Sequence, residues 1–230
     1  MPKLSGQSMI CDASSLISLT DSCFIHALYF LKRRYKGNFI IPPSVEYECV
    51  QHTMHMKMHS IHAIRLKRAI NEGVIEVVDA DIGKKVQEIR WTANNLFYAQ
   101  GTPLRLLQEG ETEMLALSRE IGVDNLLIDE RTTRMLAEDP ESLRQHLEEE
   151  LRRPITVDEE NLSSIARLTK GIRFFRSSEL LLLAYEKGYF ADYGKLKEDA
   201  IEASLYKLKY SGCAVGFGEI SDYISRNVKE

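Results

Sequence analysis

The sequence predicts an α/β fold with a mainly parallel central sheet of about five strands. Short β-prone runs alternate with longer helical patterns along the 230 residues. These runs are apolar without polar alternation, which is typical of strands buried on both faces of a parallel sheet. A hydrophobic content of 44% is enough for a substantial core. Strands are expected over residues 8–13, 38–41, 74–80, 125–129 and 172–175.

Proline, serine and glycine residues predict where the helices between these strands begin and end. Residues 42–44, Pro-Pro-Ser, begin a helix after the second strand. Neither Gly nor Pro interrupts the chain from there until Gly73, so one long helix and two shorter ones both fit. Apolar spacing predicts another helix over residues 111–121, which Gly122 ends before the fourth strand.

Residues 139–170 differ from the rest of the pattern and are expected to form a helical insert. Asp139 followed by Pro140 predicts a capped helix start. Thr156 and Glu159 have the spacing of a capping box and predict a second short helix.

After the fifth predicted strand the chain is expected to remain helical. Ser177 is the predicted cap of the helix that begins with ELLLLAYEK, and further helical patterns follow it. We therefore expect one domain over residues 1–190, with the insert inside it, and a helical C-terminal extension over residues 191–230.

Composition excludes several classes of protein. A formal net charge of −4 disfavours coating of nucleic acid by a uniformly basic surface, although local patches remain available. The four cysteines are scattered, without the spacing of a zinc site or a disulfide framework. The longest apolar run, Leu180 to Ala184, is far shorter than the roughly 20 residues of a membrane span, and no signal peptide is visible. A cytoplasmic protein without membrane attachment is expected.

Four acidic residues are expected to meet at one edge of the sheet. Asp12 and Asp129 stand at the C-terminal ends of predicted strands, where open parallel sheets form their sites. Glu48 lies early in the helix after the second strand, and Glu111 begins the helix before the fourth. Three or four oxygen ligands around one cleft suit Mg²⁺ or Mn²⁺, which activate phosphodiesters. Taken singly, Glu48, Glu111 and Asp129 also fit structural roles, whereas Asp12 would be costly to bury unpaired.

Four segments then carry a resemblance to the PIN-domain nuclease family, in the stand-alone subgroup related to toxin nucleases. They are DASSLI after the first strand, IPPSVEYE after the second, GETEMLALS opening a helix, and LLIDERTTRMLA at the fourth strand. The resemblance covers about residues 8–137 and resumes at GIRFFRSSELLLLAYEKGYF. It implies a three-layer PIN-like α/β fold, an acidic metal-binding cleft and cleavage of mostly single-stranded RNA.

The resemblance also assigns roles to individual residues. The catalytic, metal-binding acids would be Asp12, Glu48, Glu111 and Asp129, with Glu46, Glu113 and Glu130 as alternates. Ser14 would take the place of the family's small polar residue after the first acid. Ile128 departs from the threonine that many relatives carry before the fourth acid.

The implied function is that of a metal-dependent endoribonuclease using Mg²⁺ or Mn²⁺ and leaving 5′-phosphate and 3′-hydroxyl ends. The alternative is a PIN-fold RNA-binding or scaffold protein that cuts poorly or not at all, and the presence of all four acids favours activity. RNA is the expected partner, with a homodimer formed through the C-terminal extension or an inhibitory antitoxin as further possibilities. A toxin and an RNA-processing enzyme both fit, and the chain's extra length slightly favours processing.

Two further features are candidate substrate contacts. Arg176 and Ser177, at a strand end followed by a helix start, are typical of a phosphate contact. On a straight helix His52, His55, His59 and His62 would fall within an arc of about 80°, opposite Met54, Met58 and Ile61. A surface or interface stripe is the favoured interpretation. The others are a role for His52 beside Glu48 at the metal or substrate phosphate, and an independent transition-metal site.

Overall fold

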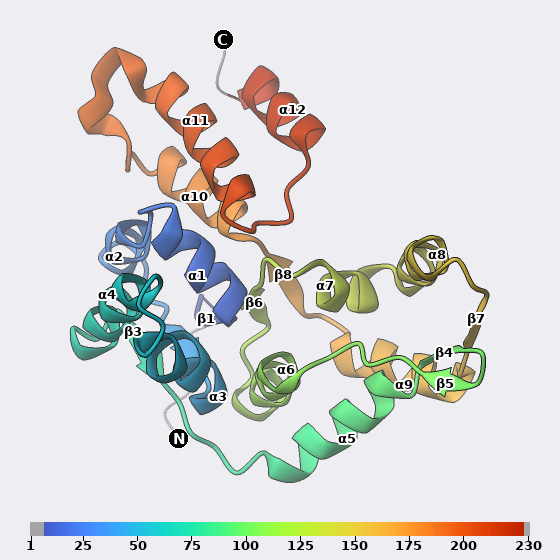
Figure 1. Cartoon of the computed structure of the whole chain (residues 1–230). Coiled ribbons are helices and arrows are strands. Elements are labelled where there is room, and N and C mark those ends of the chain that lie inside the picture. The colour runs from blue at the N-terminus through green and yellow to red at the C-terminus, as the bar shows by residue number, and fades with distance from the viewer. Residues whose placement is uncertain (1–6, 228–230) are drawn as a thin grey trace.

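The central sheet contains all five strands that the sequence predicts. The computed structural model describes residues 7–227 and arranges these strands in the order β3-β2-β1-β6-β8, each parallel to its neighbours (Figure 1). The predicted α/β class is confirmed. The strands are β1 (Met9–Cys11), β2 (Phe39–Ile41), β3 (Ile75–Val77), β6 (Asn125–Leu127) and β8 (Arg173–Phe175).

Helices cover both faces of this sheet. Helix α10 packs against α1 and α2 on one face, and α6 packs against β1 and β6 on the other (Figure 1). The helices around the sheet are α1 (Ala13–Asp21), α2 (His26–Lys32), α3 (Pro43–Glu46), the π-helical turn η1 (Tyr47–His52), α4 (Ser60–Asn71), α5 (Gly83–Asn94), α6 (Glu109–Ile121), α7 (Arg131–Glu138) and α10 (Ser177–Glu186).

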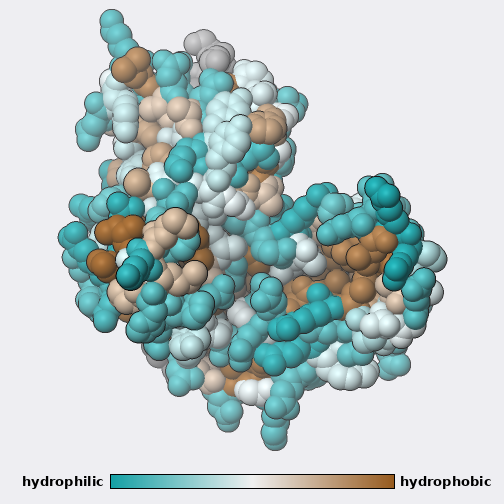
Figure 2. Space-filling view, viewed as in Figure 1, coloured by the Kyte–Doolittle hydropathy of each residue, from teal (hydrophilic) through white to brown (hydrophobic). Residues whose placement is uncertain are grey.

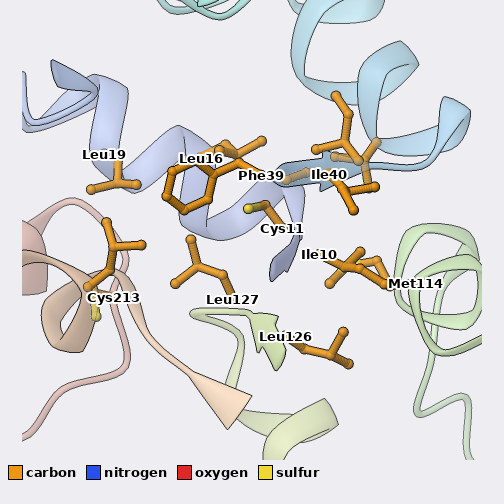
Figure 3. Close-up of a cluster of buried hydrophobic side chains, with 14 of the residues drawn as sticks. Ile10, Cys11, Leu16, Leu19, Phe39, Ile40, Met114, Leu126, Leu127 and Cys213 are labelled. Carbon is orange, nitrogen blue, oxygen red and sulfur yellow. The ribbon is translucent and has the colours of Figure 1, made fainter. Parts of the chain in front are cut away.

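Side chains of the central strands alternate between the two helical layers. Figure 3 shows Cys11 and Leu127 pointing toward α1, whereas Ile10 and Leu126 point the other way, toward Met114 of α6. All five side chains are fully buried. Because successive strand residues face opposite sides of a sheet, two covered faces require every strand position to be apolar. This explains the continuous apolar runs.

The strand order places a site at one edge of the sheet. Strand β1 is central, with β2 and β3 on one side and β6 and β8 on the other. From β1 the chain adds β2 and β3 on one side and later adds β6 and β8 on the other, so the strand order reverses between β1 and β6. Ligands of open α/β sheets bind outside the carboxyl ends of the strands at such a switch point. Asp12 directly follows β1, and Ile128 and Asp129 follow β6. The backbone N–H of Asp12 donates to the Leu127 carbonyl at 2.8 Å, which fixes the register of this edge.

A second, antiparallel sheet was not predicted from the sequence. It has the strand order β5-β4-β7, and the β4–β5 hairpin turns through Gln100 and Gly101, both with positive φ. Helix α5, also not predicted, packs against α6 and α9. The elements of this region are β4 (Phe97–Ala99), β5 (Thr102–Pro103), α8 (Pro140–Leu151), β7 (Ile155–Val157) and α9 (Glu159–Thr169).

The segment 139–170 is thus not purely helical, because strand β7 lies between its two helices. Asp139 caps α8 as predicted, and its carboxylate accepts a backbone N–H bond at 3.0 Å. The predicted capping box of Thr156 and Glu159 is wrong. Thr156 belongs to β7, and Asp158 caps α9 instead. Strand β7 pairs with β4, so residues 139–170 pack together with the β4–β5 hairpin.

The predicted helical C-terminal extension is confirmed and packs on the sheet's α1–α10 layer. It consists of η2 (Ala191–Leu196), α11 (Lys197–Tyr210) and α12 (Phe217–Asn227). Ile201, Leu205 and Leu208 bury the inner face of α11. The Ser211 hydroxyl donates to the Asp21 carboxylate at 2.6 Å and so joins the end of α11 to the end of α1.

The expected histidine stripe does not form, because the helix after β2 is broken. The chain leaves α3 through the π-helical turn η1 and resumes helical geometry at α4, with turns between residues 54 and 59. This break changes the direction of the side chains. Met58 and Ile61, which a straight helix would place opposite the histidines on an apolar face, are 80% and 49% exposed.

Among residues 7–227, no single helix is long and apolar enough to cross a membrane. The consecutive helices α1 and α2 meet the length and composition criteria when taken together, but they are bent by 111°.

Candidate active site

An open cleft of about 860 Å³ lies at the carboxyl ends of the central strands. It is lined by residues from α1, α3, η1 and α6 together with the loop after β6. Three of the four acids assigned by resemblance line this cleft. The acidic lining residues are Asp12, Glu48, Glu109, Glu111, Glu113 and Glu130.

Asp12 is the most deeply placed of these acids. Its side chain caps α1, with Oδ2 accepting the backbone N–H of Ser14 at 3.0 Å. Oδ1 faces Gly110 at the start of α6: a Cβ on Gly110 would lie 3.7 Å from this oxygen and 3.7 Å from Oε2 of Glu48. Two carboxylates from different elements therefore approach one point beside Gly110.

Glu111 lines the cleft and also stabilises the start of α6. Oε2 accepts the backbone N–H of Gln108 at 3.0 Å and completes a capping box at the start of α6. Glu113, one helical turn away from the cap, accepts the Ser44 N–H at 3.0 Å and joins α3 to α6. Glu48 is exposed at the cleft, and its carboxylate makes no hydrogen bond with residues 7–227.

The acids of the cleft disfavour one another's ionisation. Burial raises the pKa of Asp12, and the charge of Glu130 adds to this effect against bonds from Ser14 and Ala13. Burial, followed by the charge of Asp12, raises the pKa of Glu48 and raises that of Glu111 to about 7. Several carboxylates that repel each other in a partly buried cleft are stabilised in their charged form by a cation.

Asp129 lies beside this cleft rather than in its wall. Its side chain is fully buried, with Oδ1 accepting the Ser177 N–H at 2.7 Å and Oδ2 accepting the Ser177 hydroxyl at 2.6 Å. The next residue, Glu130, faces the cleft and caps α7, its two oxygens accepting the N–H groups of Thr132 and Thr133 at 2.7 Å. The structure thus places the alternate Glu130, and not Asp129, among the lining acids.

The remaining residues assigned by sequence are divided between the cleft and the interior. Ser14 and His52 line the cleft, and the Ser14 hydroxyl accepts the backbone N–H of Asp129 at 3.2 Å. Ser177 does not cap α10 but holds Asp129, and Arg176 occupies the N-cap position. Glu46 does not line the cleft.

Arg176 is not a free phosphate contact. Its guanidinium is 11% exposed and forms ion pairs with Glu179 at 2.6 Å and Glu219 at 3.0 Å. These bonds outweigh the cost of burial and raise the pKa of Arg176. The residue therefore joins α10 to α12.

One cleft residue, Arg105, was missed from the sequence. It is exposed at the cleft and has no ion pair with residues 7–227. Arg105 stands alone between Leu104 and Leu106, outside any cluster of basic residues. Its one available signal was its position just before the GETE segment that begins α6.

The donor set of the cleft suits a hard divalent cation, because every acid offers carboxylate oxygens. In the described part of the chain, no three His, Cys, Asp or Glu side chains are grouped closely enough to hold an ion. Asp12 and Glu48 nevertheless approach the same point beside Gly110, and Glu48 is free to move. The residues present therefore fit a metal that draws them together.

The raised pKa of Glu111 predicts a pH-dependent stability in chelator. Between about pH 4.5 and 7 the unfolded chain releases a proton that folded Glu111 retains, so the folded state loses stability as pH rises. Glu111→Gln keeps the acceptor of the capping box and removes this loss. We expect its unfolding free energy to match wild type near pH 4.5 and to exceed it by about 1–2 kcal/mol at pH 8, after discounting for solvent screening.

Urea unfolding in EDTA at the two pH values measures this difference. The exposed Glu149→Gln is the matched control and should show no pH-dependent gain. Equal stability of Glu111→Gln and wild type at pH 8 would contradict the raised pKa of Glu111, which burial and then the charge of Asp12 cause.

Comparison with known proteins agrees with this geometry. A family model described as PIN domain matches residues 8–142, which is more than half of the chain. No curated protein matches this chain. PIN domains are generally nucleases and typically use divalent metal ions. The matched range includes β1, β2, β3 and β6 together with the acids of the cleft, and on this basis the chain belongs to the PIN-domain family.

Proposed function

We propose that this protein is a divalent-metal-dependent endoribonuclease that hydrolyses phosphodiester bonds of single-stranded RNA in the acidic cleft. The observation that carries the proposal is the meeting of Asp12, Glu48 and Glu111, from three separate elements, in one open cleft of a PIN domain. Their raised pKa values indicate that this arrangement is unfavourable for stability alone. Electrostatic strain of this kind is typical of functional sites.

Asp12, Glu48, Glu111 and Glu130 are the residues that would hold Mg²⁺ or Mn²⁺. When bound, such an ion neutralises charge on the scissile phosphate and lowers the pKa of an attacking water. The protein positions the ligands. Ser14 fixes one oxygen of Asp12, Gln108 fixes one oxygen of Glu111, and the backbone of α7 fixes Glu130. Glu48, without such a bond, is the adjustable member.

Three further cleft residues suit an RNA strand. The exposed guanidinium of Arg105 matches the geometry of a phosphate group. Tyr47 is 59% exposed in the cleft, and its ring centroid lies 6.4 Å from that of His52. Exposed aromatic rings stack on bases that are not held in a duplex. The Tyr47 and His52 rings therefore support a single-stranded substrate over a double-stranded one.

The test is cleavage of end-labelled single-stranded RNA, with DNA of the same sequence beside it, in Mn²⁺, Mg²⁺ or EDTA. We expect internal RNA fragments with 5′-phosphate ends in either metal and none in EDTA. Cleavage that persists in EDTA would indicate a contaminant or another mechanism. Binding of RNA without cleavage in any metal would favour a non-catalytic RNA-binding protein.

A further inference from the structure

A second pocket, of about 630 Å³ and with a basic lining, lies where α7 meets the C-terminal extension. In Figure 2 the surface between the upper helices α11 and α12 and the region of α7 and α8 is visibly hollowed. Four of the nine lining residues are cationic and one is acidic. The basic pocket is lined by Arg131, Arg134, Met135, Arg176, Lys209, Ala214, Val215, Gly216 and Glu219.

Two of these cations lack a carboxylate partner among residues 7–227. The Arg131 guanidinium is exposed and has one contact, from Nε to the Met135 sulfur at 3.1 Å. Lys209 donates to the Val215 carbonyl at 2.6 Å and lies 4.4 Å from the centre of the Phe217 ring. A carbonyl and a ring orient an ammonium group without neutralising it. Both positive charges therefore remain available to an anion.

The other two cations build the wall of the basic pocket. Arg176 is neutralised by Glu179 and Glu219, and it also donates to the Ala214 carbonyl at 3.1 Å. Arg134 forms one longer ion pair, at 3.5 Å to Glu138. The bonds from Arg176 to Ala214 and Glu219 hold the loop between α11 and α12 against the start of α10, whereas the Arg134 ion pair lies within α7. Lys209 of the extension and Arg131 of α7 therefore line the same pocket.

The basic pocket adjoins the acidic cleft through consecutive residues. Glu130 lines the cleft, and Arg131 lines the basic pocket. After β8 the same arrangement recurs. Arg176 lines the basic pocket, and the next residue, Ser177, donates a hydrogen bond to Asp129. The acidic cleft and the basic pocket therefore meet at two consecutive residues, at the start of α7.

We propose that the basic pocket binds a backbone phosphate of the RNA strand next to the one that is cut, through Arg131 and Lys209. Arginine forms paired hydrogen bonds to phosphate oxygens, and lysine supplies a point charge. The identity of the strand as substrate rests on the proposed function. The C-terminal extension, which lies outside the residues matched to the PIN domain, would in this way take part in substrate binding.

The experiment measures RNA affinity apart from cleavage. Fluorescence anisotropy with labelled single-stranded RNA in EDTA is recorded over a range of salt concentrations for wild type, Arg131→Gln, Lys209→Gln and the double variant. Each single variant should bind several-fold more weakly, with the slope of log affinity against log salt reduced by about 0.7, the value for one phosphate contact to a single strand. Lys197→Gln, the same charge change on an exposed residue of α11, is the control and should bind like wild type.

Cleavage of the same RNA in Mn²⁺ separates this inference from the proposed function. Wild-type cleavage with unchanged binding by both variants would overturn the basic pocket and leave the nuclease intact. Weakened binding by the variants of a wild-type protein that cuts nothing would support the pocket and overturn the nuclease. Absence of RNA binding by wild type would overturn both. Thermal unfolding of each variant confirms that it is folded.

Discussion

Asp12→Asn is expected to abolish metal-dependent cleavage while leaving the fold intact. Asparagine retains the side-chain oxygen that accepts the Ser14 N–H, so the cap of α1 survives. It removes the negative charge that faces Gly110 and Glu48 at the centre of the cleft. Loss of one charged ligand removes several kcal/mol of metal-derived stabilisation, so at about 1.4 kcal/mol per tenfold the rate should fall by about 100-fold or more.

The same substitution should leave the unfolding free energy in EDTA at pH 8 unchanged or higher. Burial raises the pKa of Asp12, which means that its charged form costs folded-state stability above its usual pKa. Removing the charge removes this cost and also relieves Glu48 and Glu111. Calorimetric titration with Mn²⁺ should show weaker binding in parallel. Asp81→Asn, which changes an exposed acid outside the cleft, is the control. Full cleavage by Asp12→Asn would refute the cleft as the active site.

The predictable part of the fold follows from burial. Strands covered on both faces are apolar at most positions, so β1 and β2 form continuous apolar runs, and β6 forms one after the buried Asn125. Strand β4 and its partners lie at the periphery, where Tyr98 and Thr102 are not fully buried, and no continuous run marks them. The π-helical turn η1 leaves no signal in residue spacing, because a period of 3.6 is assumed when helices are read from sequence.

Three of the four acids assigned from the sequence line the cleft, and the fourth, Asp129, is replaced there by its neighbour Glu130. Asp12 follows a strand and begins a helix, which leaves its side chain one orientation. Asp129 and Glu130 are consecutive, and successive extended residues face opposite ways, so a strand end alone does not decide which one reaches the cleft. The deciding contact, from Ser177, comes from a residue far along the chain. Such long-range hydrogen bonds cannot be read from a strand pattern.

Asp129→Ala is therefore expected mainly to lower thermal stability, whereas Glu130→Gln is expected mainly to lower metal affinity and cleavage. Alanine at 129 would leave the buried N–H and hydroxyl of Ser177 without an acceptor, at a cost of about 3 kcal/mol. This corresponds to a fall in Tm of roughly 6–12 °C for a chain of this size. Glutamine at 130 keeps one of the two oxygens that accept N–H bonds from α7, so its Tm should fall by less than that of Asp129→Ala, while Mn²⁺ affinity and cleavage fall.

Ser177→Ala provides the intermediate case, because it removes one of the two hydrogen bonds to Asp129 and leaves the cleft's own acids in place. Because Oδ2 of Asp129 then lacks this donor, the unfolding free energy should fall by about 1–3 kcal/mol. Melting curves and kcat/KM for the three variants separate the roles. If Asp129→Ala melts like wild type yet cuts nothing, and Glu130→Gln keeps full metal affinity, then Asp129 itself must enter the cleft to ligate the ion. The opposite pattern assigns ligation to Glu130 and support of the strand end to Asp129.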